Sequence, residues 1–85
     1  MNIVLNSNEI AVLFQQDPTT AGDGGFQSLL VRLQGNCDQS TGELHLSGND
    51  LEKIARYAFD YGNGGWEDRL TSIFSRTLGP KLGRD

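Results

Sequence analysis

The hydrophobic positions of the chain predict one order of elements, repeated twice. Ile3 and Leu5 alternate with polar neighbours, and so do Leu44 and Leu46, which is the period-2 pattern of a short, half-buried strand. Each strand is followed by apolar residues three and four apart, a spacing that places them on one face of a helix. A glycine-rich turn and a second apolar stripe of helical spacing then follow in each half. The pattern therefore predicts strand, helix, turn and helix, twice.

Local signals mark where the predicted helices begin and end. Residues 6–9 read Asn-x-x-Glu and residues 47–50 read Ser-x-x-Asp, and both patterns are typical of a capping box at a helix N-terminus. Pro18 ends the first helix of the first half, and Gly62 ends its counterpart as a left-handed residue. Gly79 and the proline after it stop the last helix.

Two pairs of segments match each other in sequence. Residues 22–30 read GDGGFQSLL and residues 62–70 read GNGGWEDRL, so that three glycines and one leucine coincide at an offset of 40. Residues 3–10 and 44–51 match in the order of their features at an offset of 41. We interpret the chain as two tandem repeats related by a pseudo-twofold axis. The predicted divisions are repeat one at 2–35, a linker at 36–42, repeat two at 43–78 and a flexible tail at 79–85.

These predictions define the fold class as α+β and mostly helical, with four helices and a short two-stranded sheet. Each half contributes one strand, because two such short strands need each other to form a sheet. The whole chain of 85 residues is expected to form a single domain. A domain this small buries little surface, which favours a homodimer, although an internal twofold also allows a monomer.

Composition excludes several classes of protein. The single cysteine excludes an internal disulfide and a cysteine-rich zinc site, and one histidine leaves little for metal chemistry. No apolar run reaches the ~18–20 residues of a membrane span, and no basic-then-apolar leader opens the chain. We therefore expect a cytoplasmic protein with no membrane contact, no metal and no cofactor.

Catalytic residues are not evident in the sequence. Cys37 and His45 are the only candidates for a nucleophile and its base. Cys37 lies in the turn-rich linker, and His45 lies on the strand face opposite Leu44 and Leu46. No predicted element brings the thiol and the imidazole together, so the chain is not expected to be an enzyme.

The densest aromatic stretch of the chain predicts a surface that binds another protein. Four of the seven aromatic residues lie between positions 56 and 69, and Tyr, Trp and Arg dominate binding hot spots. The stripe positions of Phe59 and Trp66 favour the core for these two rings. The residues left for a protein-binding surface are Tyr57, Tyr61, Arg56 and Arg69.

A second hypothesis concerns the two glycine turns, each of which is predicted to open a helix. Backbone N–H groups at a helix N-terminus can bind a small anion, and the residues concerned are Gly24, Gly25, Gly64 and Gly65. The alternative is that these glycines only permit a tight turn. No Lys or Arg lies within either turn, and nearby acidic residues would repel an anion, so turn geometry is favoured.

Nucleic acid is a third candidate partner, which the charge of the chain disfavours. Four of the seven basic residues lie in the last seventeen positions, and Arg69 and Arg76 share one helical side. Binding to nucleic acid depends on a dense cationic face. The chain instead carries 11 acidic residues against 7 basic ones, a net charge of −4.

Three segments, at residues 24–27, 50–54 and 56–66, resemble a group of small uncharacterised bacterial proteins. The YAFDYGNGGW stretch at residues 57–66 is the most specific part of this resemblance. The resemblance implies accessory cargo of mobile elements such as phages and integrons, and it assigns no role to any residue. The leading hypothesis is therefore a non-enzymatic binding or adaptor protein that acts through protein contacts, such as an inhibitor of a larger complex.

Overall fold

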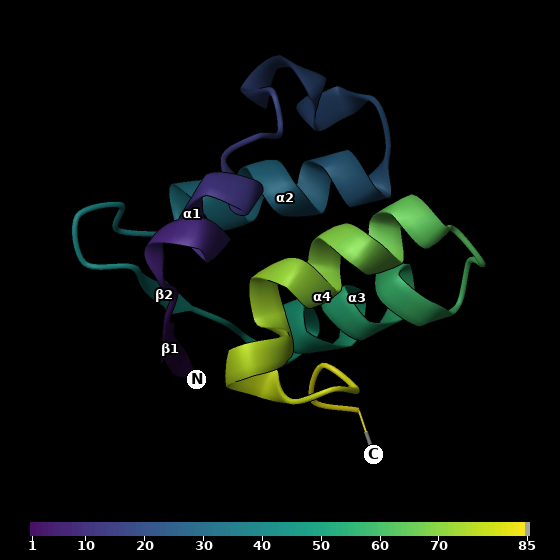
Figure 1. Ribbon diagram of the computed structural model, residues 1–85. Helices are drawn as coiled ribbons and strands as arrows, with labels where there is room; N and C mark the ends of the chain where they lie inside the picture. The colour runs from purple at the N-terminus through teal and green to yellow at the C-terminus, as the bar shows by residue number, and fades with distance from the viewer. Residues whose placement is uncertain (85) are drawn as a thin grey trace.

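Two strands and four α-helices follow one another in the order that the sequence predicts, strand, helix, helix in each half (Figure 1). The computed structural model describes residues 1–84. The elements are β1 (Asn2–Val4), α1 (Ser7–Leu13), the 3₁₀ helix η1 (Pro18–Gly22), α2 (Gly25–Gly35), β2 (Glu43–His45), α3 (Gly48–Phe59) and α4 (Gly64–Leu78). The predicted mostly helical α+β fold is confirmed, and η1 is an addition that the sequence analysis did not predict.

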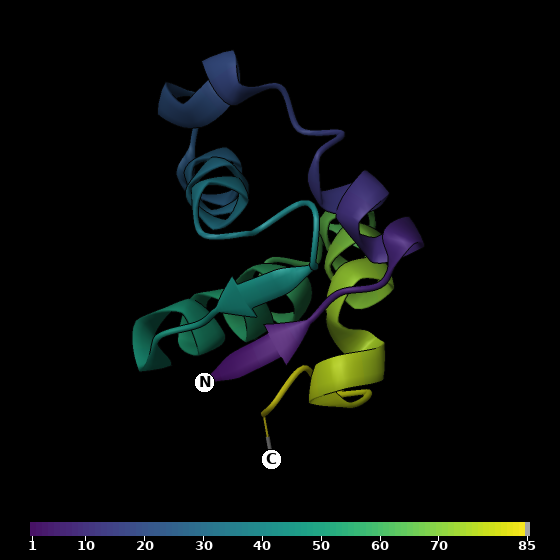
Figure 2. The ribbon, with the colours of Figure 1, turned by 90° about the vertical axis from the view of Figure 1, so that its left-hand side faces the viewer.

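The two strands pair antiparallel, one from each half, with Ile3 opposite Leu44 (Figure 2). The alternation of side chains along each strand turns Ile3, Leu5, Leu44 and Leu46 inward, and all four are buried. The polar residues between them face outward. The sheet therefore covers one side of the core with only two short strands.

Helix caps form where the sequence predicts them. The Asn6 side chain accepts a hydrogen bond from the backbone N–H of Glu9, and the Glu9 carboxylate accepts one from the backbone N–H of Asn6. Ser47 and Asp50 form the same reciprocal pair at the start of α3. Both capping boxes are thus confirmed. The carboxylate of each, from Glu9 and from Asp50, is buried at the margin of the core.

The core lies between the helices and the sheet. α4 packs against both α1 and α3, and η1 covers α2. The predicted apolar stripes of the second helices form its centre, with Leu30 and Leu33 of α2 and Leu70, Ile73 and Phe74 of α4 fully buried. In Figure 1, α3 and α4 run as an antiparallel hairpin whose turn lies at the opposite end of the molecule from the strands.

The linker at 36–42 is a tight turn that continues the sheet. Cys37 forms a bridge to Leu44 on the side of β2 away from β1. Gly42 has φ of +81°, and a Cβ on it would collide with the backbone oxygen of Leu5. Glycine is therefore required there both for its left-handed backbone and for the close approach of the two halves.

The segment predicted as a flexible tail packs against the domain over the residues that the structure describes. Leu82 is fully buried and belongs to the core cluster. Arg84 makes two hydrogen bonds to the carboxylate of Asp60, at 2.6 and 3.0 Å. The sequence analysis did not predict this packing, because a single leucine among Gly, Pro and charged residues shows neither a helical nor a strand periodicity. Asp85, the last residue of the predicted tail, lies outside the described residues.

The tandem repeat stays a prediction. The order of elements and the two capping boxes recur in both halves. The halves also differ, because α1 has 7 residues where α3 has 12, and η1 occurs only in the first half. A shared order of elements is compatible with a pseudo-twofold relationship but does not establish it.

Candidate functional site

Four aromatic rings meet where the turn between α3 and α4 approaches the start of α2. We call Phe26, Tyr57, Tyr61 and Trp66 the aromatic end. Phe26 stacks on Trp66 with ring centroids 4.9 Å apart, and Tyr57 stacks on Tyr61 at 5.1 Å. The two stacks meet edge to face, with Trp66 5.6 Å from each tyrosine. Such offset and T-shaped contacts are favourable beyond the area they bury, so the rings hold one another in place.

Local sequence explains this arrangement. Tyr57 lies in the last turn of α3, and Tyr61 follows two residues beyond the end of that helix, where its ring stacks on that of Tyr57. Gly62, with φ of +65°, then reverses the chain. Asn63 caps α4 by accepting a hydrogen bond from the backbone N–H of Trp66, and this fixes where the indole emerges. The turn therefore returns Trp66 to the two tyrosines.

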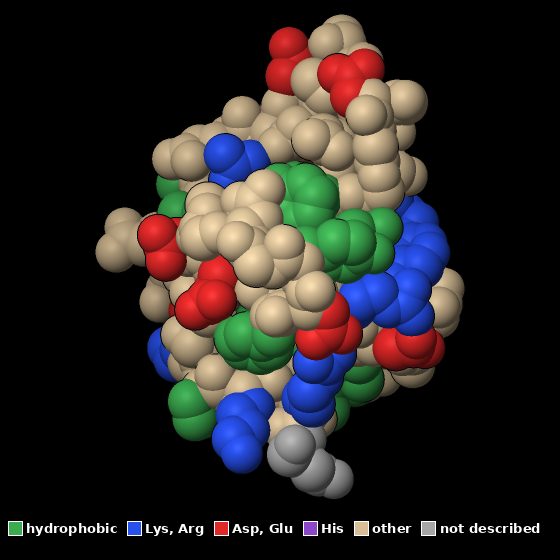
Figure 3. Space-filling view, turned by 90° about the vertical axis from the view of Figure 1, so that its right-hand side faces the viewer, with side chains coloured by type: hydrophobic (Ala, Val, Ile, Leu, Met, Phe, Trp, Pro, Cys, Tyr) green, Lys and Arg blue, Asp and Glu red, His purple; other side chains and the backbone are tan. Residues whose placement is uncertain are grey.

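The exposure of the four side chains to solvent increases across the aromatic end from Phe26 to Tyr61. Phe26 is buried, and Tyr57 and Trp66 are partly buried. Tyr61 is 54 % exposed. Among the described residues, only Met1, at the N-terminus, and Val4, on β1, are comparably exposed large hydrophobic residues. Figure 3 views this end of the molecule and shows hydrophobic side chains reaching the surface between polar atoms. Tyr61 is thus a protruding ring on a firmly packed base.

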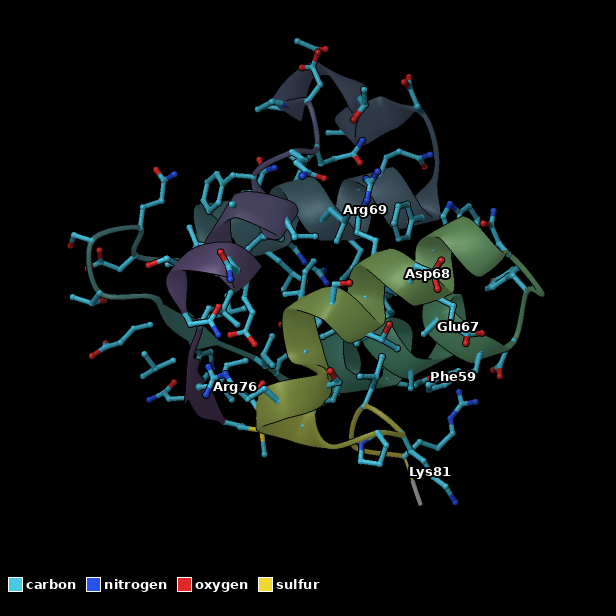
Figure 4. The ribbon with its side chains drawn as sticks, in the orientation of Figure 1. Phe59, Glu67, Asp68, Arg69, Arg76 and Lys81 are labelled. Carbon is cyan, nitrogen blue, oxygen red and sulfur yellow. The ribbon has the colours of Figure 1, made fainter. Side chains whose placement is uncertain are left out.

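The two arginines predicted to join the tyrosines are used in other ways. Arg69 donates to the side-chain oxygen of Gln16 at 2.6 Å, and its guanidinium lies 5.8 Å from the centre of the Phe26 ring. Figure 4 shows Arg69 directed from α4 toward α2. Arg56 pairs with Glu52 on its own helix. The structure therefore brings Tyr57 and Tyr61 together, places Arg69 beside Phe26, and leaves Arg56 on another face of α3.

Arg56 belongs to a line of charges that joins α3 to the C-terminal segment. Glu52 and Arg56 pair on α3, and Asp60 pairs with Arg84. The hydrogen bond from Arg84 lowers the pKa of Asp60, and the positive charges of Arg84 and Arg56 act in the same direction. These contacts hold the end of the chain against α3.

Two further arginines join the halves of the chain. Arg76 of α4 binds the buried carboxylate of Glu9, and Arg32 of α2 binds the buried carboxylate of Asp50. Each of the five arginines of the chain thus has a partner within it. The arginine side chains among residues 1–84 are therefore all engaged in contacts within the chain.

The two glycine turns differ in their surroundings. Gly24 occupies the N-cap of α2 without a side-chain cap, and the Tyr57 hydroxyl lies so close to Gly25 that a Cβ there would overlap it. At the second turn Asn63 caps α4, and a Cβ on Gly65 would meet only the Asn63 side-chain oxygen, at 3.4 Å. A pair of equivalent anion sites, as predicted for Gly24, Gly25, Gly64 and Gly65, does not follow from turns so unlike each other.

Cys37 and His45 both lie near β2 but engage different groups. The Nδ1 atom of His45 is 2.7 Å from the side-chain oxygen of Asn2. Cys37 is partly buried, and burial together with the charge of Asp38 raises the pKa of its thiol. A raised pKa disfavours the thiolate, which is the nucleophilic form.

Residues 1–84 hold neither a metal-binding cluster nor a membrane-spanning helix. Within that range no three His, Cys, Asp or Glu side chains gather closely enough to hold a metal ion. None of the helices there combines the length and the apolar character that crossing a bilayer requires.

The sequence analysis did not include Phe26, Trp66 or Gln16 in the predicted contact surface. Its assignment of Trp66 to the core agrees with the structure, in which Trp66 is partly buried against the core and Phe26 is a buried core residue. The match of Phe26 with Trp66 at an offset of 40 relates the two positions in sequence, but such a match does not predict that the two rings touch.

Comparison with known proteins adds no relative: no protein-family model, curated protein or solved structure matches the chain.

Proposed function

We propose that this chain is a small non-enzymatic binding or adaptor protein whose contact surface is the aromatic end. The observation that carries the proposal is the exposure of Tyr61, 54 %, on a base formed by Tyr57 and Trp66. A ring already held in place loses little entropy when a partner covers it. Tyr and Trp are also the residues that most often carry binding energy at protein interfaces.

The resemblance of residues 57–66 to small bacterial proteins supports a more specific role. Accessory cargo of a mobile element acts inside the host cell, where a lone cysteine such as Cys37 stays reduced. We therefore place the protein in the cytoplasm, where it would bind or inhibit a larger host or phage complex.

The test is capture of partner proteins from an extract of the native source. The variants are Tyr61→Ala and, as a matched control, Val4→Ala, because Val4 is equally exposed, 55 % against 54 %, at the far end of the molecule. We expect the wild type and Val4→Ala to retain the same protein and Tyr61→Ala to lose it. Equal retention by both variants would reject the aromatic end as the contact surface.

A further inference from the structure

Opposite charges lie on the two sides of the aromatic end. Lys53 precedes Tyr57 by one turn of α3, so both side chains share one face of the helix. On the other side, Glu67 and Asp68 are exposed in the first turn of α4. Figure 4 shows both carboxylates on α4, in front of α3. The aromatic rings thus lie between a basic side and an acidic side.

These charges are not neutralised within the chain. Among residues 1–84, no ion pair or hydrogen bond engages the side chain of Lys53, Glu67 or Asp68. All five arginines, in contrast, have partners. In Figure 3, Lys and Arg side chains gather to the right of the hydrophobic surface with an acidic side chain directly below them, and further acidic side chains lie to the left. Charges left unpaired beside an exposed ring are available to a partner.

A surface of this kind is complementary to itself. In a twofold dimer the same patch meets its copy after a rotation of 180°. If the axis passes through the aromatic end at right angles to the line that joins the two sides, the basic side of each copy meets the acidic side of the other. We propose that the aromatic end binds a second copy of this chain, with Tyr61 at the centre and Lys53 opposite Glu67 and Asp68 on both sides.

A second copy suits the properties of the chain better than an oppositely charged partner. A basic partner would be repelled by Lys53, and an acidic partner by Glu67 and Asp68. A second copy instead places an opposite charge beside each of these side chains. The net charge of −4 opposes random association of copies, so that attraction depends on this particular orientation. The inference rests on the proposed function, because it assumes that the aromatic end is a contact surface.

Sedimentation equilibrium of the full chain tests the inference. At about 0.5 mM chain we expect a reversible dimer with twice the mass of the 9.3 kDa monomer. Lys53→Glu, and separately the double variant Glu67→Lys with Asp68→Lys, should each weaken dimerisation about tenfold or more, because like charges then face each other. Circular dichroism confirms that each variant is folded before it is compared.

Mixing the two variants is the decisive step. In a mixed dimer, the glutamate that Lys53→Glu introduces in one copy faces the two lysines that the double variant introduces in the other. The unchanged Glu67 and Asp68 of the first copy face the unchanged Lys53 of the second. Dimerisation should therefore return to near the wild-type level in the mixture alone. Lys81→Glu makes the same change of charge as Lys53→Glu, and Glu43→Lys makes half the change of the double variant. Both lie outside the patch and should dimerise as the wild type does.

Three results would overturn the inference: a wild-type monomer at that concentration, equal loss in the control variants, or no recovery in the mixture. A wild-type monomer combined with Tyr61-dependent capture from the extract would remove the self-association and leave the proposed function standing. Dimerisation that Tyr61→Ala and the charge variants leave unchanged would place the interface elsewhere and remove both.

Discussion

The carboxylate of Glu9 accepts hydrogen bonds from the guanidinium of Arg76, the closest at 2.8 Å, across 67 residues of chain. Glu9 closes the capping box of α1, and Arg76 comes from α4 in the other half. Asp50, which closes the capping box of α3, pairs in the same way with Arg32 of α2. Each half therefore supplies a buried cap carboxylate and an arginine that neutralises the carboxylate of the other half. The crossed arrangement is compatible with a pseudo-twofold relationship, but Arg32 and Arg76 are 44 residues apart and so do not stand at the offset of 40 that relates the second helices.

Replacement of Glu9 by Gln should lower the free energy of unfolding by about 1–2 kcal/mol. The change removes the charge that Arg76 binds and weakens the reciprocal cap at Asn6. Urea unfolding followed by circular dichroism measures the loss. Glu52→Gln breaks a solvent-exposed pair on α3 and should cost less than about 0.5 kcal/mol. Equal effects of the two variants would contradict the special role of the buried pair.

Acid should destabilise the protein partly through Glu9. Burial raises the pKa of Glu9, but the hydrogen bonds from Arg76 and from the Asn6 backbone, with the charge of Arg76, lower it overall. A folded-state pKa below the ordinary value of 4.5 means that the ionised carboxylate stabilises the fold above pH 4.5. This stabilisation is lost as the pH falls through the folded pKa. The urea concentration at the midpoint of unfolding, measured from pH 7 downward, should decrease once the pH is below about 4.5. This decrease should be less steep in Glu9→Gln than in the wild type. A parallel decline in both proteins would show that other groups govern acid unfolding.

Gly25→Ala should disturb the aromatic end, because the new methyl group would occupy the position of the Tyr57 hydroxyl. We expect a loss of about 1–3 kcal/mol, as for overpacking, and a change in Trp66 fluorescence as the ring stack shifts. Tyr57→Phe in the same chain should restore only part of the loss, since the ring carbon Cζ would still lie 2.8 Å from the new atom.

Gly65→Ala is the matched control in the second turn. Its new atom would meet only the Asn63 side-chain oxygen, at 3.4 Å, so the change should be close to neutral. A Gly25→Ala variant as stable as Gly65→Ala would mean that Tyr57 does not lie against α2.

Leu82→Ala should cost about 2–4 kcal/mol, the usual cost of truncating a fully buried leucine. Thermal or urea unfolding of the full chain measures this loss. Lys81→Ala, one residue earlier and exposed, should change stability by less than about 0.5 kcal/mol. If both variants are as stable as the wild type, residues 79–84 do not contribute to the core.

The elements of the fold were predictable because their signals are local. Alternation at Ile3 and Leu5 marks a strand, and a capping pattern before an apolar stripe marks a helix, whatever the remainder of the chain does. Leu82 gave no such signal, since its burial depends on where α3 and α4 leave space. The same reasoning applies to η1, a single short turn with no hydrophobic period of its own.

The candidate site was only partly predictable, because some of its residues are placed by contacts between distant parts of the chain and not by local signals. Tyr57 and Tyr61 could be selected because both lie in the densest aromatic stretch of the chain. The positions of Arg56 and Arg69 depend on Glu52, Gln16 and Phe26, and for Arg69 these contacts cross between halves. Long side chains reach several possible partners, and sequence spacing does not decide among them.

Photo-crosslinking in the producing cell tests the central claim, that the aromatic end is the contact surface, most directly. A benzophenone amino acid is placed at position 61 in one variant and at position 4, equally exposed at the far end, in the other. The account predicts a discrete crosslinked product of higher mass from position 61 and none from position 4, whether the captured chain is a second copy or another protein. Crosslinking only from position 4, or equally from both positions, would contradict it.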